Sequence, residues 1–541
     1  MEIKNVLSIQ RQPIVDWAIA HYGLILLLLL LQVFVFLLVK AVKRIYFHPL
    51  SEFPGPPIYA ITNLPFVRRL YIQGTWWKHA AAFHQRFGPV VRIGPDYLMV
   101  DGSAAWPDVF GRRKQEFTKP AGYFDSADHL SIVNAPYEHH RRIRRLLSPA
   151  FSEAALSEQE PVLITHVNHL MSCLDDFAQR RQPVNMANML IFTTFDIIGQ
   201  LGFSKSLGCL ENESNRAWVL STIQGAKGLA LRQFLEHYPI LRSLIRVFSS
   251  SIARSSRNRS LASQEADTRR RLGHSSSSRD YMAHMMGGSG SQAMSELEIA
   301  ATSGALFVGG SETTATALSG LLYFLSEDTE RCRLVTSEVR SRFASRDGIG
   351  IRDCLSLQYL CACIEETLRL YPPVADLPPR VSPGAIVGGR YIPAGTRIFV
   401  SLPATFRNPA HFKDASSFRP ERWLPKSHPL HDAAFDDDNR PAVRPFSYGS
   451  RDCLGQSLAY AEMRLIAARF LFAFDFERRQ TGEDWLDTQR NFILWEKAPL
   501  EMTLYSRSES STVSYHRANC KPQLSILHMF FVMMLSASNV S

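Results

Sequence analysis

The longest apolar run of the chain lies near its N-terminus, between Trp17 and Val39. These 23 residues read WAIAHYGLILLLLLLQVFVFLLV and carry no formal charge. As a helix they would measure about 34 Å, which is enough to cross a hydrocarbon core of about 30 Å. We therefore expect a transmembrane anchor at residues 17–39.

The residues on either side of this run indicate how the anchor is oriented. Lys40, Lys43 and Arg44 follow it directly, whereas a cleaved signal peptide would have a shorter apolar run and a small-residue cleavage site. The positive-inside bias places everything after the run in the cytosol, with residues 1–16 as a short lumenal leader. Four prolines among residues 40–57 cannot continue a helix, so we expect a basic, proline-rich linker there.

Composition limits the architecture of the chain beyond the linker. The chain has 541 residues, of which 46 % are hydrophobic and 11 % aromatic, enough for one large core. Its eight cysteines are scattered and form no CxxC, which predicts a reducing compartment rather than a disulfide framework. The net charge of +10 is spread along the chain, so it fits a basic face toward a membrane or an acidic protein and does not indicate nucleic acid. We expect the acidic run Asp436–Asp438 to be an exposed loop.

The apolar segment from Ile299 to Leu325 predicts a buried helix with an unusual interruption. Gly309 and Gly310 lie in its middle, followed by Glu312 and Thr313. Two glycines cost a buried helix about 2 kcal/mol relative to alanine. Their presence predicts that something flat or bulky approaches the backbone there. The alternative is a kinked core helix whose hydroxyl groups bond back to the preceding turn.

Two further stretches carry charged residues at helical spacing. Glu366 and Arg369 lie one turn apart in CIEETLRLYPP, and such a pair alone indicates only a weak ion pair. Arg422 in FRPERW could complete a buried Glu-Arg-Arg network. YEHHRRIRRLLSPAF places His140 and Arg144 on one helical face, and arginine is well suited to holding a carboxylate.

A single cysteine, Cys453, lies in the turn-forming stretch PFSYGSRDCLGQ without a second cysteine nearby. FSYGSRDCLG fits the FxxGxRxCxG signature of the cytochrome P-450 superfamily, and GGSETT, ETLR and PERW match its other three signatures in order. The chain therefore resembles this superfamily of haem-thiolate monooxygenases over about residues 45–505. YFHPLSEFPGPP and NFILWEKAPLEM further resemble microsomal enzymes of filamentous fungi that tailor secondary metabolites.

The resemblance implies a mainly α fold with small β-sheets after one N-terminal transmembrane helix. A single monooxygenase domain would span residues 58–505, and residues 506–541 would form a C-terminal extension of unknown role. Cys453 would be the thiolate ligand of the iron of haem b. Phe446 would shield the sulfur, and Gly449 and Gly455 would allow the loop and the next helix to approach the haem closely. The residues implied for the haem propionates are Arg451, His140, Arg144 and Arg380. Gly309 and Gly310 would lie in the helix that crosses the haem.

The same resemblance assigns the remaining roles. Thr313 and Glu312 would deliver protons to bound oxygen, and Glu366, Arg369 and Arg422 would form a structural network. The loops around residues 100–135 and 205–250, Ala305, and Val374–Pro378 would line the substrate pocket. These regions are apolar, which favours a terpenoid, polyketide or alkaloid scaffold as substrate.

The implied reaction inserts one atom of O2 into an apolar small molecule, by hydroxylation, epoxidation or a related oxidation. Electrons would come from NADPH through a separate cytochrome reductase, because no GxGxxG opens a βαβ unit in this chain. A small haem electron carrier is a further candidate partner, and the shared membrane would be that of the endoplasmic reticulum. Two alternatives stay open: a haem-thiolate isomerase or dehydratase, and a non-catalytic membrane haem protein.

Overall fold

The computed structural model describes residues 3–111, 116–120, 130–238, 241, 243, 280–480 and 482–507. Its α-helices are α1 Ile3–Tyr46, α2 Pro57–Ile61, α3 Leu64–Val67, α4 Trp76–Phe87, α5 Gly102–Ala105, α6 Tyr137–Leu147, α7 Glu153–Gln179, α8 Met186–Phe203, α9 Glu213–Glu236, α12 Tyr281–Met286, α13 Glu296–Glu327, α14 Thr329–Arg342, α15 Gln358–Leu370, α16 Leu402–Phe406, α17 Gln456–Ala473 and α18 Trp485–Thr488. Short π- and 3-10 helices are η1 Arg68–Gln73, η2 Trp106–Phe110, η4 Ser148–Phe151, η7 Gly290–Gln292, η8 Asp353–Ser356, η9 Pro420–Trp423, η10 Ala433–Phe435, η11 Arg440–Ala442 and η12 Gly449–Arg451.

The strands form four small sheets. The bounds are β1 Val90–Arg92, β2 Tyr97–Val100, β3 Val184–Asn185, β4 Arg380–Val381, β5 Ala385–Val387, β6 Arg390–Ile392, β7 Arg397–Phe399, β8 Phe474–Arg478, β9 Arg490–Phe492, β10 Leu494–Glu496 and β11 Glu501–Ser506. The largest sheet has the order β1-β2-β7-β4, in which β2 and β7 run parallel with Tyr97 opposite Arg397. The others are β3-β11-β8 and the hairpins β5-β6 and β9-β10. The predicted mainly α fold with small β-sheets is confirmed.

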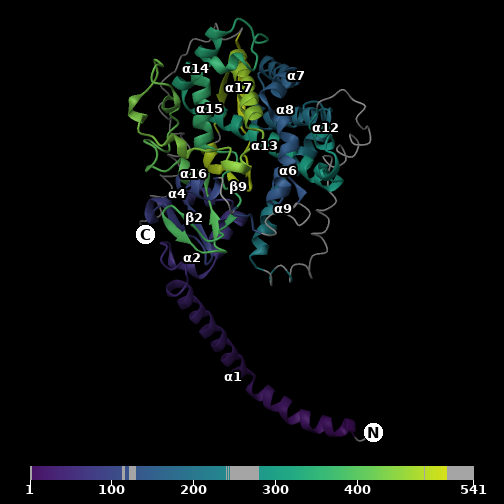
Figure 1. Cartoon of the computed structure of the whole chain (residues 1–541), viewed down its shortest axis with the longest axis vertical. Coiled ribbons are helices and arrows are strands. Elements are labelled where there is room, and N and C mark those ends of the chain that lie inside the picture. Colours follow the sequence, from purple (N-terminus) through teal and green to yellow (C-terminus); the bar gives the residue numbers. More distant parts are fainter. Residues whose placement is uncertain are drawn as a thin grey trace, which may run out of the picture.

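The N-terminal helix α1 projects from the body of the protein next to α2 and the β2 sheet (Figure 1). Its segment from His21 to Tyr46 has the length and composition of a membrane span, with a mean hydropathy of 2.9 over its most apolar window and none of that window buried against protein. The helix continues to Tyr46, so the first part of the expected linker is helical. A second apolar helix, α8, is 89 % buried and belongs to the core.

The body joins the end of the anchor helix through two arginines. The guanidinium of the buried Arg92 donates to the carbonyl oxygen of Arg44 at 2.9 Å, in the last turn of α1. Arg44 in turn donates to the carbonyl oxygen of Ile61 at 2.5 Å. A helix end leaves carbonyl groups without intrahelical partners, and Arg92 satisfies one of them. The joint between anchor and body is therefore hydrogen-bonded.

The main core lies among the long helices α7, α8, α13, α15 and α17. Helix α13 runs through the centre of this group (Figure 1). It begins at a capping box, in which the Ser295 hydroxyl accepts from the Glu298 N–H at 3.2 Å and the Glu298 carboxylate accepts from the Ser295 N–H at 2.7 Å. This cap and the packing against α8 fix the position of the segment that carries Gly309 to Thr313.

Candidate active site

A cavity of about 430 Å³ lies between α13 and the loop before α17. Ten of the residues singled out from the sequence line it: His140, Arg144, Gly309, Gly310, Thr313, Arg380, Phe446, Arg451, Cys453 and Gly455. The other five, which do not line it, are Glu312, Glu366, Arg369, Arg422 and Gly449. The cysteine loop, the glycine-containing segment of α13 and the basic face of α6 therefore meet around one space, whereas the residues of the Glu-Arg-Arg network lie outside it.

The loop before α17 presents the Cys453 thiol to this cavity. A hydrogen bond of 2.9 Å from the Cys453 N–H to the Phe446 carbonyl closes the loop. Gly449 makes the fold of the loop possible, because its φ is +83° and an added Cβ would lie 1.9 Å from the carbonyl oxygen of Phe110. The accessible surface of Cys453 faces the cavity. The surrounding protein nevertheless desolvates the thiol and raises its pKa. The thiol therefore needs a nearby cation to ionise at neutral pH.

The two other residues expected near the sulfur have different surroundings. The Phe446 ring packs against Tyr460, with ring centroids 5.0 Å apart. Gly455 precedes the first residue of α17, and the nearest atom to an added Cβ would be Phe151 Cε1 at 3.8 Å. Contacts within the described protein therefore do not require glycine at position 455, which leaves room on the cavity side.

Basic side chains gather at one part of the cavity wall. His140 lies on α6, and burial together with the charges of Arg451, Arg144, Lys119 and Arg380 lowers its pKa to about 3. The pKa of Arg380 is lowered to about 10, first by burial and then by Arg451. Lys119 was not singled out from the sequence; burial and the neighbouring arginines lower its pKa as well. Buried cations gathered in this way favour an anion as their partner.

The three arginines differ in how far they are already engaged. Arg144 donates to the Asp452 carbonyl at 2.6 Å and forms an ion pair with the Asp452 carboxylate. Arg451 donates to the Ala135 carbonyl at 2.9 Å and pairs with Glu116. The Arg380 guanidinium lies over the Phe110 ring, 5.3 Å from its centroid, and has no hydrogen bond or ion pair within the described part of the chain. Arg380 is thus the guanidinium most available to a carboxylate in the cavity.

The two glycines of α13 have different surroundings. At Gly309 no described atom lies within 4 Å of an added Cβ, so this face of the backbone opens onto the cavity. At Gly310 an added Cβ would lie 2.5 Å from Ile198 Cδ1, so this glycine permits close packing of α13 on α8. The Thr313 hydroxyl donates to the Gly309 carbonyl at 2.7 Å while its side chain lines the cavity. Thr313 therefore makes the hydrogen bond to its own helix that the kinked-helix alternative predicts, and it also faces the cavity as the resemblance implies.

Glu312 faces away from the cavity. It is 1 % exposed and accepts a hydrogen bond from the Thr316 hydroxyl at 3.1 Å. Its carboxylate also forms an ion pair with Lys497, which in turn donates to the Thr316 hydroxyl at 2.9 Å. Lys497 lies just after β10 and was not singled out from the sequence. The adjacent pair Glu312 and Thr313 is thus divided between two faces of α13.

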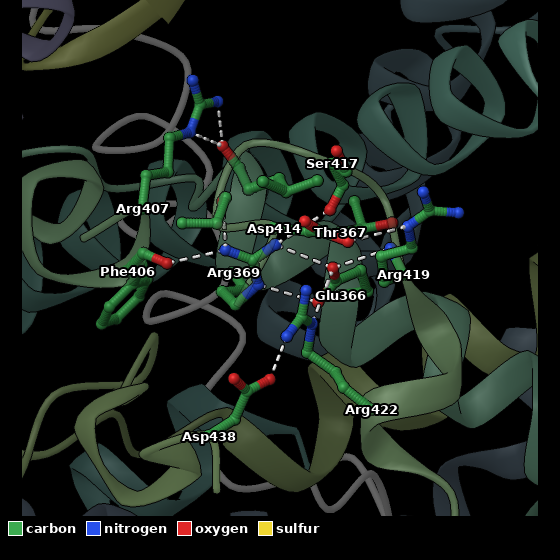
Figure 2. Close-up of polar contacts among 12 residues, drawn as sticks. Glu366, Thr367, Arg369, Phe406, Arg407, Asp414, Ser417, Arg419, Arg422 and Asp438 are labelled. Atoms are coloured by element: carbon green, nitrogen blue, oxygen red, sulfur yellow. Dashed lines mark hydrogen bonds and ion pairs between the residues drawn. The ribbon is translucent and has the colours of Figure 1, made fainter. Parts of the chain in front are cut away.

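Glu366 and Arg369 of α15 form a fully buried ion network with Arg422 (Figure 2). Arg369 binds Glu366 through two nitrogens, each 2.8 Å from a carboxylate oxygen, and also donates to the carbonyls of Phe406 and Ala415. Arg422 Nε donates to Glu366 Oε1 at 3.1 Å. These cations and the backbone N–H of Arg419 hold the pKa of Glu366 below its usual range in spite of burial. The predicted Glu-Arg-Arg geometry is present.

Two further side chains extend this network beyond what the sequence indicated. The Trp423 indole N–H donates to Glu366 Oε2 at 2.8 Å. Asp438 forms an ion pair with Arg422, and its side chain is only 3 % exposed (Figure 2). The prediction that Asp436–Asp438 is merely an exposed loop is wrong for Asp438, because the arginine draws that carboxylate inward. The acidic pattern alone could not show which of the three aspartates has a buried partner.

The expected pocket loops are also partly corrected. Phe110, Ile132, Ala305 and the segment Val374–Pro378 contribute to the wall as expected, but no residue described between 205 and 243 does. The β9-β10 hairpin contributes instead, through Asn491, Ile493 and Leu494. Hydropathy patterning could not reveal this, because the hairpin reaches the cavity only through long-range packing.

The haem implied by the sequence resemblance fits the residues that line this cavity. A thiol faces the cavity from one element, the open backbone at Gly309 faces it from another, and Arg380 and its basic neighbours lie where carboxylates would be attracted. The chemistry of this donor set matches a flat, iron-containing group with two propionates. Among the described cysteines, only Cys453 lines the cavity: Cys363 is fully buried in the core, and Cys361 near it is partly buried on α15.

Comparison with known proteins gives the same result. The family model for cytochrome P450 matches residues 53–504. The monooxygenase astJ of Aspergillus oryzae is 36 % identical over 477 residues, covering 87 % of this chain and 94 % of that protein. Trichothecene C-15 hydroxylase of Fusarium sporotrichioides is 35 % identical over 484 residues, covering 87 % and 96 %. Because the family model matches most of its length and these relatives are more than 30 % identical over most of both chains, this chain belongs to the cytochrome P450 family and is a monooxygenase.

Proposed function

We propose that this monooxygenase hydroxylates or epoxidises an apolar scaffold during the biosynthesis of a fungal secondary metabolite. The observation that carries the proposal is the mostly apolar wall of the cavity that Cys453 faces, formed by side chains such as Phe110, Ile198 and Ile493. Apolar pockets with few polar groups favour hydrocarbon-rich ligands. Relatives named as fungal monooxygenases, one of them a trichothecene hydroxylase, support a terpenoid or polyketide substrate over a sugar or nucleotide.

We assign the cofactor from the cysteine and the basic residues that line the same cavity. Haem bound through the Cys453 thiolate would supply the iron at which O2 is reduced and its O–O bond cleaved. Arg380 would hold one propionate, and His140, Arg144 and Arg451 would complete the basic surroundings of the propionates. Gly449 would keep the loop in its tight turn, while Phe446 would exclude water from the sulfur.

The residues of α13 would position oxygen and protons. Gly309 would let bound oxygen lie close to the helix backbone, and Gly310 would keep α13 packed against α8. Thr313 would donate a hydrogen bond from its hydroxyl into the cavity, turning from the Gly309 carbonyl with which it is now bonded. Glu312 would relay protons from the far side of the helix, where it meets Lys497.

Electrons would come from NADPH through a separate cytochrome reductase on the same membrane, with a small haem electron carrier as a second donor. The α1 span would hold the enzyme in the endoplasmic reticulum membrane with its catalytic domain in the cytosol. Three basic residues near the end of the span, Lys40, Lys43 and Arg44, support this orientation. Membrane lipid would then be both the support of the enzyme and the source of its apolar substrate.

Two experiments test this function. The full chain is expressed in membranes with a NADPH-cytochrome reductase, and the reduced carbon monoxide complex is examined for the red-shifted absorption that a thiolate ligand produces. Cys453→Ala should abolish that absorption, whereas Cys361→Ala, the matched control on α15, should keep it. Persistence of the absorption in Cys453→Ala would contradict the ligand assignment.

The second experiment follows oxygen. Candidate terpenoids and polyketides are supplied with labelled O2 and NADPH, and one labelled oxygen atom should appear in the product for each turnover. Conversion without label and without NADPH would instead indicate an isomerase or dehydratase. Haem binding with no conversion and no reductase-dependent NADPH consumption would indicate a binding protein.

A further inference from the structure

One polar side chain on the cavity wall has no role in the haem site described above. Asn491 lies on β9, lines the cavity and is 2 % exposed. Neither the oxygen nor the nitrogen of its carboxamide has a hydrogen-bond partner among the described residues. Burying an amide without a partner is costly, so folded proteins rarely keep one unless something else binds it.

The carboxamide cannot lessen this cost by changing its protonation. Glu462 on α17 also lines the cavity, and neither of its carboxyl oxygens has a hydrogen-bond partner in the described part of the chain. Burial raises the pKa of Glu462 to about 8, so at neutral pH this group avoids an unpaired charge by keeping its proton. A carboxamide is neutral and always has two N–H donors and an acceptor oxygen to satisfy. For Asn491 only a hydrogen-bonding ligand or water can do so.

Contacts outside the β9-β10 hairpin fix the position of Asn491. Its backbone N–H donates to the carbonyl of Gly74, the residue after η1, at 2.8 Å. An added Cβ at Gly74 would lie 3.0 Å from the Phe492 ring, so the hairpin packs closely there. Trp495, opposite Asn491 on β10, donates from its indole N–H to the Pro372 carbonyl at 2.9 Å. The hairpin is therefore held in place before a ligand arrives, which lowers the entropic cost of binding.

The residue at the tip of this hairpin has a strained backbone. Ile493 lies between β9 and β10 with a φ of +75°, a left-handed conformation that a β-branched residue rarely adopts. Ile493 and the next residue, Leu494, both line the cavity. Strain of this kind persists mainly at sites that contact ligands, where the surrounding structure maintains it. The hairpin thus combines a strained tip with an unpaired carboxamide in one cavity wall, and both features are typical of a ligand-binding surface.

The chemistry of the cavity wall limits what this ligand can be. Leu70, Phe399 and Leu494 are among the apolar residues that line the same cavity as Asn491. The ligand must therefore be mainly apolar and carry a group that can pair with an amide. A hydroxyl group both donates and accepts a hydrogen bond, and a ketone oxygen accepts one from the amide N–H. A plain hydrocarbon would leave the carboxamide unpaired, so the site should bind it less tightly.

We propose that Asn491 is a specificity-determining residue, which binds a hydroxyl or ketone group already present on the substrate. The enzyme then acts on an oxygenated apolar scaffold rather than on a bare hydrocarbon. A reaction that introduces an oxygen atom into the scaffold, or leaves one there, must precede this step. The proposal rests on the monooxygenase function proposed above, because it names the substrate class of the same site.

The first test asks whether the carboxamide serves folding or binding. Asn491→Leu keeps a side chain of similar size and removes the unpaired polar atoms, so the haem-loaded full chain should melt at the same or a higher temperature without substrate. Asn408→Leu is the matched control. Asn408 is 8 % exposed and its carboxamide oxygen accepts from the Ala410 N–H at 3.0 Å, so this variant should melt at a lower temperature. A fall of similar size in Asn491→Leu would overturn the proposal, because the carboxamide would then be paired within the fold.

The second test measures selectivity. Two pairs of probes differ only in an oxygen function: cedrol with cedrane, and menthone with menthane. Dissociation constants for the full chain are obtained from the change in haem absorption on binding. The oxygenated member of at least one pair should bind about tenfold more tightly, which is the effect of one neutral hydrogen bond. Asn491→Leu should abolish this preference, whereas Asn408→Leu should keep it.

Asn491→Ala gives a second route if Asn491→Leu fails to load haem, since it removes the carboxamide without adding bulk. Equal binding within both pairs, no binding of any probe, or a preference that survives in the Asn491 variants would overturn the proposal. Binding needs neither O2 nor NADPH, so its outcome is separate from that of the labelling experiment. Selectivity without oxygen incorporation would contradict the proposed function alone, and incorporation without selectivity would contradict only the role of Asn491.

Discussion

Arg422 links two buried carboxylates, and its removal should destabilise the domain far more than a surface substitution would. Its guanidinium binds Glu366 and Asp438, whose side chains are 0 % and 3 % exposed, and also donates to the Lys413 carbonyl at 3.0 Å. Arg422→Met keeps most of the side-chain volume but removes all three contacts. Glu366 retains the two bonds from Arg369, so the main loss falls on Asp438.

The size of the effect can be worked from these contacts. Removing one partner of a buried ion pair costs about 3–5 kcal/mol, because the remaining charge stays buried and unpaired. Asp438 keeps one hydrogen bond, from the Lys413 N–H at 2.7 Å, which favours the lower part of that range. We therefore expect Arg422→Met to lower the free energy of unfolding by about 3 kcal/mol, out of a typical total of 5–15 kcal/mol.

A double-mutant cycle separates this charge effect from lost packing. Asp438→Asn removes the stranded charge while its side-chain oxygen can still accept from Lys413. In the Arg422→Met background it should recover about 1–2 kcal/mol, although alone it is destabilising. Unfolding in urea is followed by far-ultraviolet circular dichroism and by haem absorption. A loss below 1 kcal/mol in Arg422→Met, or single-variant losses that simply add, would refute the argument that Arg422 neutralises Asp438.

The remaining predictions concern the cysteine loop, the central helix, the anchor and a pH effect. Gly449→Ala should abolish haem loading, because the added Cβ would lie 1.9 Å from the Phe110 carbonyl oxygen. Gly225→Ala is the control, since no described atom lies within 4 Å of an added Cβ there, and it should load haem normally. The haem absorption of the two purified proteins is compared. Thr313→Ala should keep haem and NADPH oxidation while product per NADPH falls and hydrogen peroxide rises; unchanged peroxide would favour the purely structural helix bond to Gly309. A chain truncated to begin at His48 should be released from membranes by alkali yet still bind haem, and retention at full-length levels would argue against a single anchor. Burial raises the pKa of Glu462 to about 8, so the unfolded state loses the Glu462 proton at lower pH than the folded state does. The free energy of unfolding should therefore fall by about 5 kcal/mol as the pH rises from about 4.5 to about 8. Melting temperatures measured across this range should fall less steeply in Glu462→Gln.

Residue spacing predicted the parts of the site that depend on local structure. A turn of 3.6 residues is enough to bring Glu366 and Arg369 together. The anchor was predictable for a similar reason, because a span is defined by length and hydropathy alone. The way in which the end of the anchor helix joins the body could not be predicted, because the hydrogen bond from Arg92 to Arg44 joins residues 48 positions apart.

The parts that spacing missed depend on which way a side chain points and on what meets it from elsewhere. Glu312 and Thr313 are neighbours in the sequence, yet successive helical residues point about 100° apart, so one lies behind α13 and the other faces the cavity. The partner that fixes Glu312 is Lys497, 185 positions away. Asp438 is likewise defined by Arg422 rather than by its own acidic neighbours.

The distribution of charge around the cavity gives these findings one physical basis. On the basic part of the wall, burial and then the charges of neighbouring arginines lower the pKa values of Arg380, His140 and Lys119, so this part of the wall favours an anion. On α17, burial acts on Glu462 without a nearby cation and raises its affinity for a proton instead. The same desolvation therefore favours proton release from one group of residues and proton storage in another. The fold keeps these two environments apart in one cavity, because the basic residues come from other elements than α17.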